Sequence, residues 1–249
     1  MKLYFIGAGP GDPELLTVKA KRIIHTADII IYAGSLVNPE ILKFAKKTTL
    51  IYDSSKLNLE QIIKIIKNAK NTNKVVARLH TGDPSIYGAI QEQITWCEKE
   101  KIDFEAVPGV SSFCAAAAAL KQELTLPNVS QTVIITRLSG RTKVPKKENL
   151  ESLAKIKATL IIFLSIDKID EIVKQLLCGY NKNTPVAIVA KASWNDEKII
   201  KGTLKDIAAK VKKEKINRQA LIFVGDVLKR KDFQKSKLYD KNFSHSYRA

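Results

Sequence analysis

Short apolar runs alternate with amphipathic segments along the first half of the chain. The runs cover residues 2–6, 28–32, 49–52, 75–79 and 104–107. They are only a few residues long and are bounded by turn residues, which predicts buried strands. Strands that alternate with helices are typical of a mainly parallel sheet, so we predict an α/β unit in this half.

The segments between the runs place apolar residues on one face of a helix. Apolar positions that recur at i, i+3, i+4 and i+7 are typical of an amphipathic helix packed against a sheet. These positions are Leu16, Ala20, Ile23, Ile24 and Ala27 in one segment, and Leu59, Ile62, Ile63 and Ile66 in another. The alanine run at 115–119 also favours a helix, and its small side chains allow close packing.

Residues 121–131 break this alternation, and a second α/β unit follows them. The break contains Pro127 and Asn128, which favour a loop. Strands are predicted at 132–136, 159–164, 185–190 and 220–224. Helical spacing recurs at Ile169, Ile172, Val173, Leu176 and Leu177, and again at Leu204, Ile207, Ala208 and Val211. We therefore predict two α/β domains, at residues 1–120 and 121–249.

The composition fits a folded protein with a core, because 45% of the 249 residues are hydrophobic. No apolar run approaches the ~20 residues that span a bilayer. The run at 3–6 is too short for the core of a signal peptide. We therefore expect a soluble cytoplasmic protein.

Cysteine and histidine residues are few and scattered. Cys97, Cys114 and Cys178 are widely spaced and odd in number, so we expect buried, reduced thiols. The three histidines, His25, His80 and His245, form no cluster along the sequence. The sequence therefore predicts no structural metal.

The chain is strongly basic, with 42 Lys and Arg against 25 Asp and Glu and a formal net charge of +17. Nucleic acid, a membrane surface and a small molecule with several carboxylates are all partners that such a charge attracts. A lysine-rich surface without a specific partner explains the same number. The charge alone therefore selects no function.

A glycine-rich loop, GAGPGDP at residues 7–13, follows the first predicted strand. Its glycines suggest the G-x-G-x-x-G fingerprint of dinucleotide-binding proteins, but Asp12 occupies the position of the third glycine. Its carboxylate would meet a pyrophosphate with like charge, and Pro10 and Pro13 stiffen the loop. We therefore predict a rigid turn that does not bind NAD.

The stretch RLHTGDPSIYGAIQEQ at residues 78–93 joins the fourth predicted strand to the next helical segment. Gly82 permits backbone angles and close approaches that a side chain would forbid, Asp83 supplies a carboxylate, and Pro84 stiffens the exit. Loops at the carboxyl ends of strands are where open α/β sheets bind ligands. We predict a small polar ligand here, and the alternative is a plain strand-to-helix turn.

Three motifs in order resemble the tetrapyrrole methylase family of S-adenosylmethionine enzymes. They are IGAGPGD at 6–12 with LLT at 15–17, GDP at 82–84, and VPGVSS at 107–112. Other stretches are similar to the precorrin-4 C11-methyltransferase branch: YAGSLV at 32–37, LHTGDPSIYGA at 79–89, SQT at 130–132 with TR at 136–137 and GRT at 140–142, ASW at 192–194, and SKLYD at 236–240 with FSH at 243–245. The resemblance covers essentially the whole chain. A departure is Asn195, where the branch pattern has proline.

The resemblance implies a kidney-shaped homodimer of chains with two α/β domains of the class III methyltransferase type. The methyl donor, S-adenosyl-L-methionine, is expected in the cleft between the domains, and the tetrapyrrole in a trough. Small side chains at a donor site let backbone groups hydrogen-bond the ligand. The donor-binding residues that the resemblance implies are Pro10, Thr81, Gly82, Asp83, Ile86, Ser111, Ser112, Leu164, Ala192 and Ala220.

The reaction implied by the resemblance is methyl transfer to ring carbon C11 of precorrin-4 or its cobalt form, on the way to cobalamin. The sulfonium charge is neutralised in the transition state, so a dry pocket that aligns sulfur, methyl and carbon supplies most of the catalysis. The conjugated macrocycle provides an electron-rich carbon, and no general base is singled out. Asp83 and Tyr87 are the positioning candidates, although Tyr87 also fits a half-buried aromatic residue at a helix start.

Arg137 and Arg141 flank a basic loop after the first strand of the second domain, and Lys143, Lys146 and Lys147 follow it. A guanidinium group pairs with a carboxylate through two hydrogen bonds, and precorrins carry several acetate and propionate groups. Because the resemblance places this loop near the trough, we predict that both arginines bind the substrate. For the lysines we favour a solvated basic loop.

Two other functions fit parts of the sequence. An RNA ribose methyltransferase of the same superfamily would explain the basic charge and would bind RNA with a steep salt dependence. A non-enzymatic basic α/β binding module, whose glycine loops are only turns, would have no affinity for the methyl donor. The partners we expect are a small tetrapyrrole and a second copy of the chain, without nucleic acid or membrane.

Overall fold

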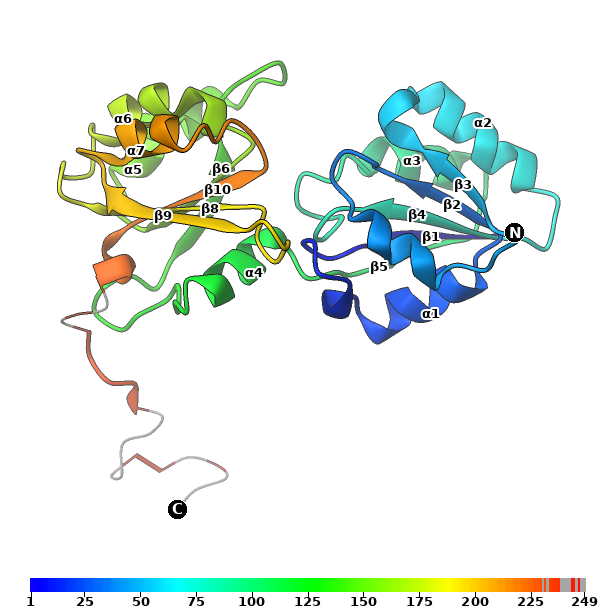
Figure 1. Cartoon of the computed structure of the whole chain (residues 1–249), viewed down its shortest axis with the longest axis horizontal. Coiled ribbons are helices and arrows are strands. Elements are labelled where there is room, and N and C mark those ends of the chain that lie inside the picture. Colours follow the sequence, from blue (N-terminus) through cyan, green and yellow to red (C-terminus); the bar gives the residue numbers. More distant parts are fainter. Residues whose placement is uncertain (230, 232, 238–242, 245, 247–249) are drawn as a thin grey trace. The chain divides into compact units, whose positions relative to one another are not determined.

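Two five-stranded sheets form the framework of the chain in a computed structural model (Figure 1). The structure describes residues 1–229, 231, 233–237, 243–244 and 246. Helices flank each sheet, so the predicted α/β fold class is confirmed. The last family-like motifs are only partly covered, because Leu238, Tyr239, Asp240 and His245 lie outside the described residues.

The chain divides into two compact units. The first contains Met1–Ala115 and Lys191–Asp196, and the second contains Ala116–Ala190 and Glu197–Ala249. The division falls inside helix α4 (Ser112–Ala119). The predicted domain bounds, residues 1–120 and 121–249, stay a prediction. Hydrophobic spacing gives no sign that Lys191–Asp196 packs with the first unit.

The first unit contains a fully parallel sheet with the strand order β3-β2-β4-β1-β5, as the sequence predicts. Its strands are β1 (Lys2–Gly7), β2 (Ile29–Tyr32), β3 (Leu50–Asp53), β4 (Val75–His80) and β5 (Phe104–Val107). Its helices are α1 (Val18–Thr26), α2 (Leu59–Ala69) and α3 (Gln91–Lys99), with short 3-10 turns η1 (Pro13–Leu15), η2 (Pro39–Phe44) and η3 (Ser54–Lys56).

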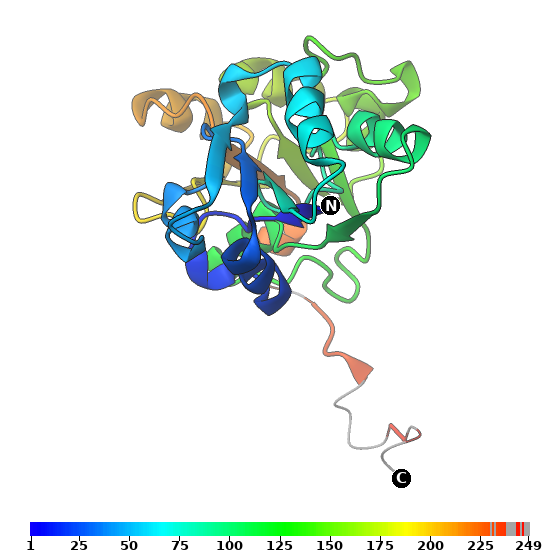
Figure 2. The same ribbon diagram turned by 90° about the vertical axis from the view of Figure 1, so that its right-hand side faces the viewer.

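Helices cover both faces of this sheet (Figures 1 and 2). Ile24 of α1 packs in one hydrophobic cluster with Leu79, and Ile66 of α2 packs in another with Phe5. A sheet that is buried on both faces has nearly continuous apolar strands, which explains the runs seen in the sequence. Helix α1 begins at Val18 because the Thr17 side chain accepts a hydrogen bond from Ala20 N at 3.1 Å and caps it.

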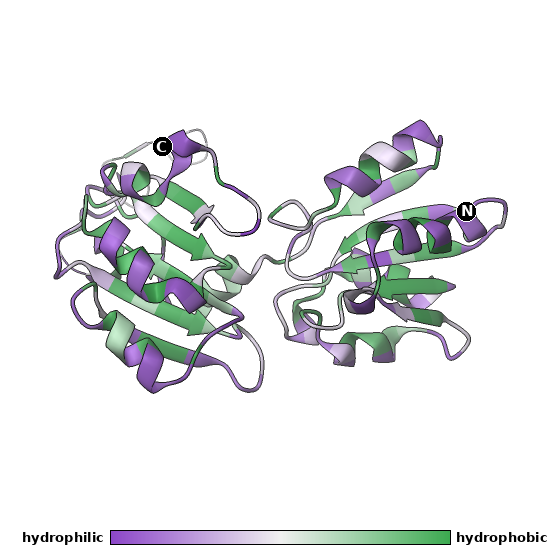
Figure 3. Ribbon diagram, turned by 90° about the horizontal axis from the view of Figure 1, so that it is seen from above, coloured by the Kyte–Doolittle hydropathy of each residue, from purple (hydrophilic) through white to green (hydrophobic). Residues whose placement is uncertain are grey.

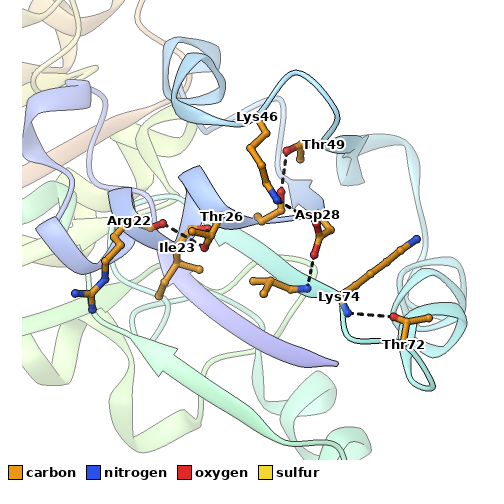
Figure 4. A network of polar contacts seen from close by, with 10 residues as sticks. Arg22, Ile23, Thr26, Asp28, Lys46, Thr49, Thr72 and Lys74 are labelled. Carbon is orange, nitrogen blue, oxygen red and sulfur yellow. Dashed lines mark hydrogen bonds and ion pairs between the residues drawn. The ribbon is translucent and has the colours of Figure 1, made fainter.

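Asp28, directly before β2, forms hydrogen bonds at the amino-terminal edge of the sheet (Figure 4). Its carboxylate accepts hydrogen bonds from Val75 N at 2.8 Å and from Lys46 Nζ at 3.1 Å. The bond from Val75 and then that from Lys46 hold the pKa of Asp28 below its usual value. The Thr49 hydroxyl supports the same edge by donating to Ala27 O at 2.8 Å. The opposite, carboxyl-terminal edge of the sheet carries the glycine-rich loops.

The second unit contains a mixed sheet with the order β6-β7-β10-β8-β9. Strands β6 and β7 are parallel, and the other neighbours are antiparallel. The strands are β6 (Val133–Arg137), β7 (Thr159–Phe163), β8 (Pro185–Ala190), β9 (Lys198–Thr203) and β10 (Ala220–Val224). The helices are α5 (Leu150–Ala154), α6 (Ile169–Leu176) and α7 (Ile207–Lys213), with 3-10 turns η4 (Lys146–Glu148), η5 (Ile166–Lys168) and η6 (Asp226–Lys229).

The core of the second unit lies between its sheet and helices α5, α6 and α7. Ile172 of α6 and Ile207 of α7 pack in one cluster with Ile188 of β8 and Ile222 of β10. Hydrophobic colours follow the strands of both sheets and hydrophilic colours gather on the helices (Figure 3). None of the helices in the described part of the chain is long and apolar enough to cross a membrane.

Two features of the structure differ from the predictions. Strand β9 is not predicted, because it is an edge strand whose residues are exposed or half-buried, and its lysines interrupt the apolar pattern. Cys97 is buried, but Cys114 and Cys178 are exposed, so the prediction of buried thiols is wrong for these two. Cys114 lies in the alanine-rich helix α4, where the sequence does not show which face is covered.

Candidate functional site

Three glycine-containing loops meet at the carboxyl ends of β1, β4 and β5. Strand β1 pairs with both β4 and β5, so the loops that follow the three strands leave the sheet side by side. Gly9 in the first loop and Gly82 in the second form an isolated antiparallel bridge. Gly82 N donates to Gly9 O at 2.7 Å, and Gly9 N donates to Gly82 O at 3.3 Å.

The third loop packs against the other two through glycine backbone. A Cβ on Gly109 would lie 2.3 Å from Gly82 O and 2.7 Å from Gly7 Cα. A Cβ on Gly7 would lie 2.5 Å from Gly109 Cα, so neither position has room for a side chain. Gly82 also has a φ of +62°, a left-handed conformation that favours glycine. Gly7 and Gly109 are therefore needed for the packing of these loops, and the predicted set of donor residues omits both, although both lie in its motifs.

The carboxylate of Asp83 joins the second loop to the third. Its Oδ2 accepts a hydrogen bond from Gly109 N at 2.9 Å, and its Oδ1 accepts one from Ser85 N at 2.9 Å. Burial opposes ionisation, but the hydrogen bonds from Ser85 and Gly109 outweigh it, so the pKa of Asp83 is lowered. The carboxylate therefore holds the second and third loops together. Its contact with the donor stays a prediction.

The remaining predicted donor residues of the first unit lie around these loops. Ser111 and Ser112 are close to Gly82, because a Cβ there would lie 3.5 Å from Ser111 Cα and 3.4 Å from Ser112 N. Pro10 is buried in the first loop, and Thr81 is half-buried directly before Gly82. The structure thus brings residues from three separate motifs to one edge of the sheet.

Ile86 and Tyr87 lie in an irregular segment before α3. Ile86 is half-buried, whereas Tyr87 is 43% exposed and has a φ of +55°. Helix α3 begins only at Gln91, so the interpretation of Tyr87 as a half-buried residue at a helix start is wrong. Its role as a positioning residue stays a prediction.

A buried polar cluster of Arg78, His80 and Gln93 lies beneath this segment. Arg78 donates from Nη1 to Ser54 Oγ at 3.0 Å and from Nε to Gln93 Oε1 at 3.4 Å. Gln93 in turn donates from Nε2 to Ala89 O at 3.2 Å and so holds the segment before α3. Burial lowers the pKa of Arg78 to about 10. The sequence pattern does not reveal this cluster, because Arg78 and His80 interrupt an apolar strand.

His80 is expected to make the protein sensitive to acid. It is 6% exposed, and burial, followed by the charge of Arg78, lowers the pKa of His80 to about 3. The unfolded chain, with a histidine pKa of about 6.5, then takes up a proton that the folded chain does not. Between pH 7.5 and pH 5 this difference should lower the free energy of unfolding by about 2 kcal/mol.

Urea denaturation at several pH values checks this expectation. In the His80→Leu variant, the loss of unfolding free energy between pH 7.5 and pH 5 should be smaller than in the wild type by about that amount. The exposed His25 supplies the control, since His25→Gln removes a histidine from the surface. Equal pH dependence in the wild type and His80→Leu would contradict the burial of a neutral His80.

Two predicted donor residues, Leu164 and Ala220, lie in the second unit. Ile162 pairs with Ile222 in the antiparallel register of β7 and β10, which puts Leu164 and Ala220 at the same end of that sheet. Ala220 is buried, whereas Leu164 is 68% exposed and has a φ of +52°. Ala192, also predicted for the donor site, is buried in the segment Lys191–Asp196 of the first unit.

The two predicted substrate arginines differ in their surroundings. Arg137 donates from Nη1 to Thr142 O at 2.9 Å and from Nη2 to Lys143 O at 3.4 Å, so its guanidinium group holds its own loop together. Arg141 is exposed in that loop. No three His, Cys, Asp or Glu side chains within the described ranges are grouped as a metal site would need.

Solved structures share this architecture. The chain matches the crystal structure of a cobalt-precorrin-4 methyltransferase of cobalamin biosynthesis with a TM-score of 0.89 and 43% identity, covering 91% of this chain and 95% of that one. It matches a uroporphyrin-III C-methyltransferase from Thermus thermophilus, complexed with S-adenosylhomocysteine, with a TM-score of 0.78 and 27% identity over 92% and 94% of the two chains. The fold and the loops define a methyltransferase with two α/β units.

The family follows from two sequence comparisons. The model of the family described as Tetrapyrrole (Corrin/Porphyrin) Methylases matches residues 2–208. A cobalt-precorrin-4 C(11)-methyltransferase from Methanocaldococcus jannaschii is 60% identical over 99% of this chain and 96% of its own length. The chain therefore belongs to the tetrapyrrole methylase family.

Proposed function

We propose that the protein transfers a methyl group from S-adenosyl-L-methionine to C11 of cobalt-precorrin-4 in cobalamin biosynthesis. The observation that carries the proposal is the 60% identity, over 99% of the chain, to an enzyme with this activity. The matched stretch spans both units and all three loop motifs. It also favours the cobalt-containing substrate over metal-free precorrin-4, and the cobalt ion belongs to the substrate.

The loops of the first unit are suited to the methyl donor. The absence of side chains at Gly7, Gly82 and Gly109 lets the three loops pack closely together at this edge. We assign the donor to Pro10, Thr81, Gly82, Asp83, Ile86, Ser111, Ser112 and Ala192 of the first unit, with Leu164 and Ala220 of the second. The relative that contains S-adenosylhomocysteine supports a donor of this chemical class.

The donor supplies an activated methyl group, and the residues of the chain orient the reactants and exclude water. The lowered pKa of Asp83 keeps its carboxylate ionised at neutral pH. An anionic loop favours a cationic sulfonium compound over its neutral product. The loop contacts of Asp83 fix the position of this charge, so we assign Asp83 to binding the donor and releasing the product, while the alignment of the reactants lowers the barrier.

The basic loop after β6 is assigned to the substrate. The hydrogen bonds of Arg137 to the backbone of its own loop support a shaping role for that residue. The exposed Arg141 is then the group that pairs with a substrate carboxylate, through the planar fork that lysine lacks. A homodimer and a cytoplasmic location complete the proposal, and the three free cysteines support a reducing compartment.

Arg141→Lys should raise the Michaelis constant for the tetrapyrrole about tenfold while the affinity for S-adenosylhomocysteine stays unchanged. The loss of one bidentate, charge-assisted contact, worth roughly 1.5 kcal/mol, explains the size. Steady-state kinetics and calorimetry measure the two quantities. Arg22→Lys, an exposed arginine of α1, is the matched control. If both constants change together, Arg141 does not bind the substrate.

Calorimetric titration of the purified protein tests the donor assignment. S-adenosylhomocysteine should bind at one site per chain, and ribosomal RNA should bind weakly and without saturation. Tight, strongly salt-dependent binding of RNA would favour an RNA ribose methyltransferase. Absence of S-adenosylhomocysteine binding would leave only a basic α/β binding module.

A further inference from the structure

The segment Lys191–Asp196, called the strap below, follows β8 and precedes β9, yet it packs with the first unit. Two hydrogen bonds hold it to the first glycine-rich loop. Trp194 donates from Nε1 to Pro10 O at 2.9 Å. Ser193 Oγ accepts from Asp12 N at 3.0 Å. More than 180 residues of sequence separate the partners in these contacts.

The first loop is shaped to receive the tryptophan ring. A Cβ on Gly11 would lie 2.2 Å from Trp194 Cδ1 and 2.3 Å from Trp194 Nε1. Only glycine therefore allows the indole ring to approach the backbone this closely. Gly11 is required here for close packing, while Gly9, two residues earlier, has a left-handed φ of +73°.

The strap adopts a conformation that its own sequence does not favour. Lys191 and Ser193 have φ values of +50° and +66°, which are unfavourable for residues other than glycine. Trp194 N donates to Lys191 O at 2.9 Å, and Lys191 forms an ion pair with Asp196. Unfavourable backbone angles persist where surrounding contacts determine them, and such positions are frequent at functional sites.

The backbone of the first loop is held from several directions. Asn38 donates from Nδ2 to Gly11 O at 2.8 Å, and Gly82 bonds to Gly9. The strap adds the contacts to Pro10 O and Asp12 N. The loop therefore has its shape fixed by side chains from distant parts of the chain, and Pro10 within it is assigned to the donor site.

We propose that Trp194 and Ser193 are positioning residues, which hold the first loop in the conformation that binds the methyl donor. The inference rests on the proposed function, because it takes the donor to bind at these loops. A loop that is fixed before binding loses less conformational freedom when the ligand binds, and this raises affinity. Donor affinity should therefore depend on the strap, although neither the indole nitrogen nor the Ser193 hydroxyl is required to touch the donor.

Trp194→Phe tests the hydrogen bond to Pro10 O while it retains an aromatic ring. One lost hydrogen bond of ordinary strength corresponds to a rise of about fivefold in the dissociation constant of S-adenosylhomocysteine. The Michaelis constant for S-adenosylmethionine should rise by a similar factor. The turnover number at saturating donor and the Michaelis constant for the tetrapyrrole should stay at wild-type values. If Trp194 served only the stability of the fold, Trp194→Phe would not raise the donor constants while leaving the turnover number and the Michaelis constant for the tetrapyrrole unchanged.

The chain offers matched variants. Trp96→Phe alters the other tryptophan, a half-buried residue of α3 that packs against a hydrophobic cluster of the first unit, and should leave the dissociation constant unchanged. Ser193→Ala should weaken binding by a similar factor to Trp194→Phe. Gly11→Ala should also weaken binding in the wild type, but its effect should be smaller in a Trp194→Ala background, because the ring that it displaces is absent.

Fluorescence gives a readout that does not depend on activity. In Trp96→Phe, Trp194 is the sole tryptophan, and its quenching by acrylamide should be the same with and without S-adenosylhomocysteine, because the ring is held against Gly11 and Pro10 before the donor binds. If Trp194→Phe binds S-adenosylhomocysteine as tightly as the wild type, or loses only thermal stability, the inference is overturned and the proposed function stands. If the wild type itself does not bind S-adenosylhomocysteine, the proposed function and the inference both fail.

Discussion

Gly109→Ala is expected to abolish the binding of S-adenosylhomocysteine and to destabilise the first unit. The new Cβ would lie 2.3 Å from Gly82 O and 2.7 Å from Gly7 Cα, and both neighbours are backbone atoms that cannot rotate away. The loops must move apart, and overpacking of this kind typically costs about 1–3 kcal/mol of unfolding free energy. Calorimetric titration and urea denaturation measure the two effects.

Gly140→Ala is the matched control for Gly109→Ala. A Cβ on Gly140 would meet nothing within 4 Å, so the same chemical change should leave binding and stability close to those of the wild type. A folded Gly109→Ala protein that binds S-adenosylhomocysteine normally would show that the three loops do not form the donor site.

Asp83→Ala should raise the dissociation constant of S-adenosylhomocysteine by one to two orders of magnitude. The substitution removes the acceptor for Gly109 N and Ser85 N, and with it the link between the second and third loops. One hydrogen bond between the charged carboxylate and the donor contributes roughly 1.5–3 kcal/mol, which sets the size of the effect. Asp83→Asn keeps one acceptor oxygen without the charge and should give an intermediate loss.

Asp53 provides an unusually close control for Asp83. Its Oδ1 accepts hydrogen bonds from Gly34 N at 3.0 Å and Ser55 N at 2.9 Å, and so it joins two loops in the same way at another strand end. Asp53→Ala should therefore weaken the local fold without changing the dissociation constant. Equal losses of binding in the two variants would mean that Asp83 acts on stability alone.

The sequence predicts the parallel sheet because its strands are buried on both faces and therefore appear as continuous apolar runs. It does not predict β9, whose exposed lysines obscure the pattern at the edge of the second sheet. It also does not identify the exposure of Cys114, because an alanine-rich helix has no polar face to mark the solvent side. The pattern of apolar residues therefore predicts strands that are buried in a sheet. It predicts half-exposed strands and helix faces poorly.

For the candidate site, the motifs identify the loops but not their partners. Loops at strand ends follow from the sequence, whereas the adjacency of Gly9, Gly82 and Gly109 depends on the strand order β4-β1-β5. The docking of Trp194 on Gly11 joins residues that no spacing rule relates. Such contacts follow from tertiary packing, so local patterns cannot predict them.

Analysis of the reaction product tests the central claim most directly. The protein should be incubated with cobalt-precorrin-4 and S-adenosylmethionine that carries a ¹³C-labelled methyl group, and the product examined by mass spectrometry and NMR. We predict one added methyl group per macrocycle, with its ¹³C resonance coupled to ring carbon C11. No transfer, or a methyl group on a different ring carbon, would contradict the proposed function.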